Sequence, residues 1–190
     1  GDRENIQRSA ALIVRMMEKR GLAARLVSAP GANPLVFGEL RTPGATRTIV
    51  FYAHYDGQPI DPAEWATPAF EPVLRDRPIE DGGAVIPLAS AARSIAPESR
   101  LYARSAADDK APIVALMTAL DAIRAAGLKT RSNIKFVFDG EEEAGSPNLE
   151  KMLAADKGLF SGDLWLVCDG PLYQTRQQSI IFGARGIATF

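Results

Sequence analysis

The sequence is poor in several residue types, and each scarcity excludes a class of protein. Its 190 residues include one cysteine, Cys168, which rules out an internal disulfide. No apolar run approaches the roughly 20 residues that a membrane-spanning helix needs. The net charge is -1, so the chain lacks the basic excess typical of nucleic-acid or anionic-membrane binding. We therefore expect no nucleic-acid and no membrane partner. We expect a cytoplasmic location, unless a signal peptide has been trimmed from the polar N-terminus.

Histidine is equally scarce, and this limits the metal chemistry that the chain can support. His54 is the single histidine among 23 acidic residues. Any metal site built from these residues must therefore rely on carboxylates or be incomplete. The remaining composition, 46% hydrophobic and 24% charged, is that of an ordinary globular domain with a sizeable core.

The order of apolar patterns along the chain predicts an α/β fold. Helical spacing occurs over residues 4–20, 112–126 and 148–155. Strand patterns occur over residues 24–28, 35–40, 47–53, 100–103, 133–138 and 163–168. Residues 58–99 are rich in Pro, Gly and Ala and predict a long excursion with a short hairpin. The alternation of strands and helices predicts a layered sandwich, in which helices flank a central, largely parallel but mixed sheet.

Metal-binding and acidic side chains follow three of these strands and precede one helix. They are His54 with Asp56, the glutamate run 141–143, Asp169, and the pair Asp108-Asp109. In open α/β sheets, ligand sites form outside the carboxyl ends of the strands. We therefore expect all four groups to converge on one crevice.

Each group also has an ordinary structural explanation. A lone histidine after a strand is commonly a satisfied core residue, and two aspartates before a helix commonly cap it. A glutamate run is commonly a solvated surface, and Asp-Gly-Pro is commonly a turn. Together, however, several carboxylates in one crevice repel one another unless a cation neutralises them. The combination favours a metal site.

The motifs resemble those of the dinuclear zinc metallopeptidases. This family includes carnosinase-type dipeptidases, aminoacylases, succinyl-diaminopimelate desuccinylase and glutamate carboxypeptidase. Three stretches carry the resemblance: Ala-His-Tyr-Asp at 53–56, Leu-Tyr-Ala-Arg-Ser-Ala-Ala-Asp-Asp-Lys at 101–110, and Glu-Glu-Ala-Gly-Ser at 142–146. The fold implied is that of a zinc exopeptidase.

The resemblance implies two Zn²⁺ ions in a complete site, although Mn²⁺ or Co²⁺ would also suit mixed carboxylate and imidazole ligands. His54 and Asp169 would bind the first ion, Asp108 would bridge both, and Glu143 would bind the second. The family often has a cis peptide between the two aspartates at 108 and 109.

The resemblance also implies two catalytic roles. Glu142 would be the general base that takes a proton from the attacking water. Asp56 would lie on the same side of the extended chain as His54 and hold its imidazole in the ligand tautomer.

The sequence departs from the family pattern in two respects. Ala103, Ser105 and Ala111 replace family glycines. The family's second histidine ligand lies after a lid domain, and residues 182–187 resemble the first strand of that lid. We therefore expect residues 1–180 to be the N-terminal part of an incomplete catalytic domain and residues 181–190 to begin the lid. On this interpretation the isolated fragment is inactive, and the full-length protein is a homodimer through the lid.

The preferred functional interpretation is an exopeptidase that cleaves dipeptides or terminal residues. Asp rather than Glu at position 169 resembles the peptidase branches of the family more than the desuccinylase branch. An N-acyl-amino-acid deacylase or desuccinylase is the alternative within the family, so the substrate is a small peptide or an acyl-amino acid. A non-catalytic metal-binding domain is the alternative of another class, and Glu142 argues against it because a simple metal binder needs no base.

Overall fold

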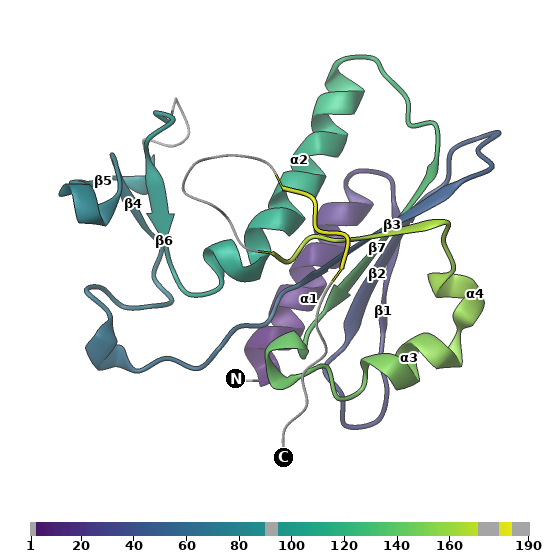
Figure 1. Ribbon diagram of the computed structural model, residues 1–190, viewed down its shortest axis with the longest axis horizontal. Coiled ribbons are helices and arrows are strands. Elements are labelled where there is room, and N and C mark those ends of the chain that lie inside the picture. The colour runs from purple at the N-terminus through teal and green to yellow at the C-terminus, as the bar shows by residue number, and fades with distance from the viewer. Residues whose placement is uncertain (1–2, 90–94, 171–178, 184–190) are drawn as a thin grey trace.

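A five-stranded mixed sheet forms the centre of the molecule, seen in a computed structural model that describes residues 3–89, 95–170 and 179–183 (Figure 1). Its strands lie in the order β1 (Ala23–Val27), β2 (Leu35–Leu40), β7 (Asn133–Asp139), β3 (Thr48–His54) and β8 (Leu164–Val167). The pairings of β3 with β7 and β8 are parallel, whereas those of β1 with β2 and of β2 with β7 are antiparallel. The predicted mixed α/β sheet is confirmed. Its parallel part, β7-β3-β8, brings three strand ends to one edge.

Helices cover both faces of this sheet (Figure 1). One face packs against α1 (Arg3–Glu18) and α2 (Ala111–Ala125). The other packs against α3 (Leu149–Ala155) and α4 (Lys157–Phe160). This is the layered sandwich that the sequence predicts.

The alternation of side chains along the strands creates the two cores. Val36 and Phe136 contribute to the core beneath α1 and α2, together with Met17 and Met117. Phe37 and Val137, the next residues along the same strands, contribute to the core beneath α3 and α4. At roughly 25 cal/mol per Å² of buried apolar surface, these two layers are the main source of the fold's stability.

The predicted excursion contains more structure than a single hairpin. It includes the short 3₁₀ turns η1 (Pro62–Glu64) and η2 (Ile79–Asp81) and the antiparallel hairpin of β4 (Val73–Arg75) and β5 (Val85–Ile86). Strand β6 (Arg100–Tyr102) pairs with β4 and completes a small three-stranded sheet, which projects from one side of the molecule (Figure 1). From β6 the chain returns to the main body through the turn η4 (Ala106–Lys110). The excursion therefore leads directly into the Asp108-Asp109 motif.

The edge strand β8 has no helix over it in the described part of the chain. Leu164, Trp165, Leu166 and Val167 are 37–65% exposed, so this edge presents an apolar surface. Residues 181–183 contain no strand, and residues 184–190, where most of the expected lid strand falls, lie outside the described residues. Within the described ranges, no helix has the length and apolarity to cross a membrane.

Candidate metal centre

The four predicted groups meet at the edge where the parallel strands end. His54 is the last residue of β3, and Asp169 follows β8 by two residues. The Nε2 atom of His54 lies 2.9 Å from Oδ1 of Asp108, and 3.8 Å from both Oε2 of Glu142 and Oδ2 of Asp169. Segments about 115 residues apart in sequence therefore surround one imidazole. The predicted convergence is confirmed.

Ligand atoms in this cluster form two groups around His54. In the first, atoms of His54, Asp108 and Glu143 lie within 4.8 Å of one another. In the second, atoms of His54, Asp109 and Asp169 lie within the same distance. Each group is compact enough to hold one ion. The ligand set expected from the sequence placed Asp169 and Asp108 on the same ion. In the structure, the carboxylate grouped with Asp169 and His54 is that of Asp109.

Asp109 is a site residue that the sequence interpretation did not assign. Its side chain is 2% exposed, and Oδ2 accepts a hydrogen bond of 3.1 Å from the backbone N–H of His54. The peptide bond between Asp108 and Asp109 is cis, as the resemblance implied. The paired aspartates in the sequence were the only signal for this residue, because the sequence does not show toward which side each carboxylate turns.

The imidazole of His54 is oriented from behind by Asp56. His54 is 1% exposed, and its Nδ1 lies 3.2 Å from Oδ1 of Asp56. These two atoms are both buried, and neither has another partner among the described residues. An Nδ1 proton therefore faces a carboxylate, which leaves Nε2 directed at the acidic cluster, where the ring would offer its lone pair to a cation once the Nε2 proton is released.

The electrostatics of the cluster favour a cation. Burial opposes the charged form of His54 and is the largest single influence, but Asp56, Asp109 and Glu142 together outweigh it and raise the His54 pKa to about 9. Burial is also the main influence on Asp109. With the charges of Asp169 and Asp108, it raises the Asp109 pKa to about 7. His54 and Asp109 thus both bind a proton more tightly than usual, and the negative charge of the neighbouring carboxylates contributes at both.

Among the described residues, no arginine or lysine forms an ion pair with a carboxylate of this cluster. Within the described ranges, His54 is the only basic side chain within 4 Å of a cluster carboxylate. One imidazole facing several carboxylates matches a divalent cation such as Zn²⁺, Mn²⁺ or Co²⁺ in ligand chemistry. The residues present therefore fit the implied metal.

The three glutamates of the 141–143 run have different surroundings. Glu141 is 8% exposed and accepts hydrogen bonds from the Asn33 backbone N–H at 2.7 Å and from Asn148 Nδ2 at 2.9 Å, so it anchors the loop rather than facing the cluster. Glu142 and Glu143 begin the 3₁₀ turn η5 (Glu142–Ala144) and do face it. Burial raises the pKa of Glu142 above its usual range. A base with raised proton affinity beside the ligands suits proton transfer.

One replaced glycine has the backbone conformation that favours glycine. Ser105 has a φ of 64°, in the left-handed region, and its hydroxyl would overlap a side chain at Gly57. The segment before Asp108 therefore packs tightly against the segment after Asp56.

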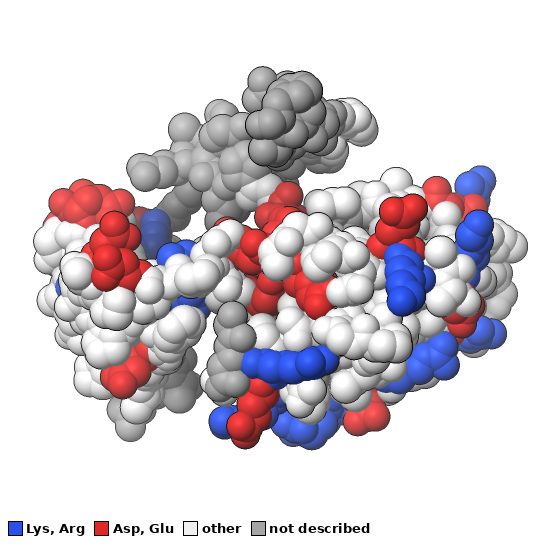
Figure 2. Space-filling view, turned by 90° about the horizontal axis from the view of Figure 1, so that it is seen from below, with Lys and Arg blue, Asp and Glu red and all other residues white. Residues whose placement is uncertain are grey.

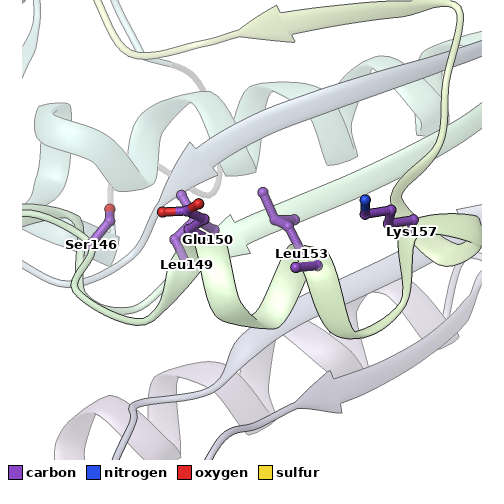
Figure 3. A pocket seen from close by; sticks show the side chains of 6 residues that line it. Ser146, Leu149, Glu150, Leu153 and Lys157 are labelled. Atoms are coloured by element: carbon purple, nitrogen blue, oxygen red, sulfur yellow. The ribbon is translucent and has the colours of Figure 1, made fainter.

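The acidic cluster is separate from the pocket beside α3. Figure 2 shows acidic side chains gathered near the middle of the face seen from below, between the main body and the projecting small sheet. A separate groove of about 580 Å³ runs along α3 (Figure 3). Its lining residues are Ser146, Leu149, Glu150, Leu153, Ala154 and Lys157. None of these belongs to the cluster, so the groove is distinct from the candidate metal centre.

Comparison with known proteins agrees with this geometry. The sequence pattern of Peptidase family M20/M25/M40 matches residues 50–181. The chain belongs to this family. Human Beta-Ala-His dipeptidase is 33% identical over 83% of the chain and 27% of its own length. The Cys-Gly metallodipeptidase of Schizosaccharomyces pombe is 25% identical over 92% of the chain and 33% of its own length.

Solved structures give the same result. Human carnosine dipeptidase 1 superposes with a TM-score of 0.67 at 27% identity, covering 88% of the chain and 33% of that protein. The M20 family metallo-carboxypeptidase Sso-CP2 from Sulfolobus solfataricus superposes with a TM-score of 0.70 at 28% identity, covering 90% and 34%. The chain therefore spans about a third of the length of these relatives. The predicted membership of the metallopeptidase family is confirmed.

Proposed function

We propose that this chain supplies most of the active site of a metal-dependent hydrolase that cleaves the amide bond of dipeptides. The observation that carries the proposal is the convergence of Asp108, Glu142 and Asp169 within 4 Å of the single buried imidazole, His54. The dipeptidase names of the similar proteins support this substrate class.

In this proposal, His54, Asp108 and Asp169 would hold one Zn²⁺, with Asp109 beside them, and Asp108 and Glu143 would contribute ligands to a second. Bound divalent cations supply Lewis acidity, which polarises a carbonyl group and makes water more acidic. The chain's own task is to hold its ligands in place. Asp56 does so for His54 by holding the Nδ1 side of the ring.

Glu142 is the proposed general base. Its Oε2 atom lies 3.8 Å from His54 Nε2, beside the ligands but outside both three-residue ligand groups. Burial raises its pKa, so the carboxylate accepts a proton from the attacking water more readily and then delivers it to the leaving amine. A non-catalytic metal-binding domain would have no use for this arrangement.

A deacylase is the second candidate within the family. Succinyl-diaminopimelate desuccinylase of Acidovorax ebreus is 32% identical over 57% of the chain and 22% of its own length. Asp169, which resembles the peptidase branches, favours the dipeptidase.

The chain holds one histidine, so we propose that full activity needs a further metal ligand from outside these 190 residues. We propose that the 190 residues alone are inactive. We also propose that the complete protein is a homodimer through its lid domain.

The test compares wild type with Glu142→Ala in a longer chain that includes the family's downstream histidine. Hydrolysis of β-Ala-His, Cys-Gly and an N-acyl-amino acid is followed by release of the free amine, and bound zinc is measured by atomic absorption. We expect Glu142→Ala to retain zinc and to lose about 10²–10⁴-fold in kcat. Cleavage of the acyl-amino acid alone would replace the dipeptidase with the deacylase. A wild type that binds zinc but hydrolyses none of the three would favour the non-catalytic alternative.

A further inference from the structure

Gln58 holds the carboxylate of Glu143 at both oxygens. The backbone N–H of Gln58 donates to Oε1 of Glu143 at 3.2 Å, and its side-chain Nε2 donates to Oε2 at 2.6 Å. The same Nε2 also lies 3.5 Å from the backbone oxygen of Glu143. One residue therefore fixes both the position and the rotation of this carboxylate.

The link between the two segments runs in both directions. The backbone N–H of Glu143 donates to Oδ2 of Asp56 at 3.1 Å, while the other oxygen of Asp56 faces the imidazole of His54. His54, Asp56 and Gln58 are spaced two residues apart, which places alternate side chains of an extended segment on one side. The five residues from His54, at the end of β3, to Gln58 thus carry the imidazole, its partner and the donor pair that holds Glu143.

The chemistry of an amide suits this position. A glutamine side chain donates a hydrogen bond without adding charge, so Glu143 keeps its full negative charge for a cation. Each carboxylate oxygen has a second lone pair for an ion, because a hydrogen bond occupies one only. A carboxylate that is already oriented also loses less rotational freedom when the ion binds.

We propose that Gln58 is a positioning residue that holds Glu143 in the orientation needed to bind a divalent cation. The inference rests on the proposed function, because it presumes that Glu143 is a metal ligand. Removing the partners of metal ligands typically weakens metal binding 10- to 100-fold. Gln58 is exposed to solvent, so we expect an effect near the lower end, about tenfold.

The experiment titrates the longer chain that includes the family's downstream histidine with Co²⁺, and it follows by visible absorption the second ion, which Glu143 would bind. Gln58→Met keeps the length of the side chain and the backbone N–H but removes the amide donor. Gln7→Met makes the same change on the exposed side of α1 and serves as the matched control. We expect about tenfold weaker Co²⁺ binding in Gln58→Met and no change in Gln7→Met. An unchanged His54 imidazole NMR signal in metal-free Gln58→Met shows that the segment that begins at the end of β3 is intact.

A double-mutant cycle separates positioning of Glu143 from a general effect on the site. In a Glu143→Ala background, Gln58→Met should leave Co²⁺ affinity unchanged, because the group it positions is gone. Co²⁺ binding by Gln58→Met equal to wild type would overturn the inference, as would the same weakening in the Glu143→Ala background. Failure of the proposed function is seen separately in the wild type. If Co²⁺ does not bind, or does not broaden the His54 signal, the metal site itself is wrong and the inference falls with it.

Discussion

His54 should release a proton when a divalent cation binds. Burial is the largest influence on this imidazole and favours its neutral form, yet the charges of Asp56, Asp109 and Glu142 raise its pKa to about 9. At pH 7.5 the metal-free imidazole is therefore almost fully protonated, whereas a ligand imidazole must be neutral. Binding should release about one proton per His54-bound ion, and affinity should fall about tenfold per pH unit below this pKa. Asp109, with a pKa of about 7, is about a quarter protonated at pH 7.5 and adds that fraction.

The assay is calorimetric titration with Zn²⁺ at pH 7.5 in two buffers of different ionisation enthalpy, which gives the number of protons released. Asp56→Asn is the matched variant, since it removes the charge beside Nδ1 but keeps an acceptor oxygen there. At a pKa near the ordinary 6.5, only about a tenth of the imidazole is protonated at pH 7.5, so the His54 contribution should nearly disappear. Release of less than about 0.3 proton by wild type, or equal release by Asp56→Asn, would refute the reasoning.

The raised pKa of His54 also fixes how the metal-free fold depends on pH. The folded pKa lies above the ordinary value, so the stabilisation is fully present below about pH 6.5. It is lost as the pH rises through about 9, because the imidazole gives up its proton and its attraction to the carboxylates.

Three further predictions concern stability and follow from packing and binding. Gly57→Ala should destabilise the fold by about 1–3 kcal/mol in urea unfolding, because the added methyl group would overlap the Ser105 hydroxyl. Adding Ser105→Gly to the same chain should restore much of this stability. The absence of any rescue would contradict this contact. Met117→Ala, at a side chain 1% exposed between α2 and the sheet, should cost about 2–5 kcal/mol in urea unfolding, and a cost below about 1 kcal/mol would refute the assigned core. Zn²⁺ at about 100 times its dissociation constant should add about 2.7 kcal/mol of stability, seen as a higher Tm that EDTA reverses, and a Tm indifferent to Zn²⁺ would contradict the metal centre.

The sequence predicted the layers of the fold well, because the apolar spacing that defines each element is local. Residues 112–126 showed helical spacing, and α2 spans Ala111–Ala125. Residues 133–138 showed a strand, and β7 spans Asn133–Asp139. Spacing does not reveal which strand pairs with which or in what direction. The antiparallel pairings within β1-β2-β7 and the pairing of β6 with β4 were therefore not predicted.

The candidate site was predicted by residue type but not by orientation. His54, Glu142 and Asp169 lie together because three strands end at one edge, which the element order implied. The grouping of Asp109 with Asp169 depends on how a turn directs two adjacent carboxylates. No sequence pattern encodes that direction.

Two residues of the site region were missed for a different reason. Glu141 has the same side chain as its two neighbours, and only its hydrogen bonds to Asn33 and Asn148 show that it anchors the loop. Gln58 is a neutral side chain in a loop, so its type gave no indication of a role. Its significance depends on a contact with a residue 85 positions away.

The most direct test of the account is anomalous scattering from crystals of the chain grown with added Zn²⁺. We predict a zinc peak at a bonding distance of about 2 Å from His54 Nε2, with carboxylate oxygens of Asp108 and Asp169 also within its coordination sphere. A map with no peak beside His54, or with zinc bound only elsewhere on the surface, would contradict the central claim that these segments form one metal centre.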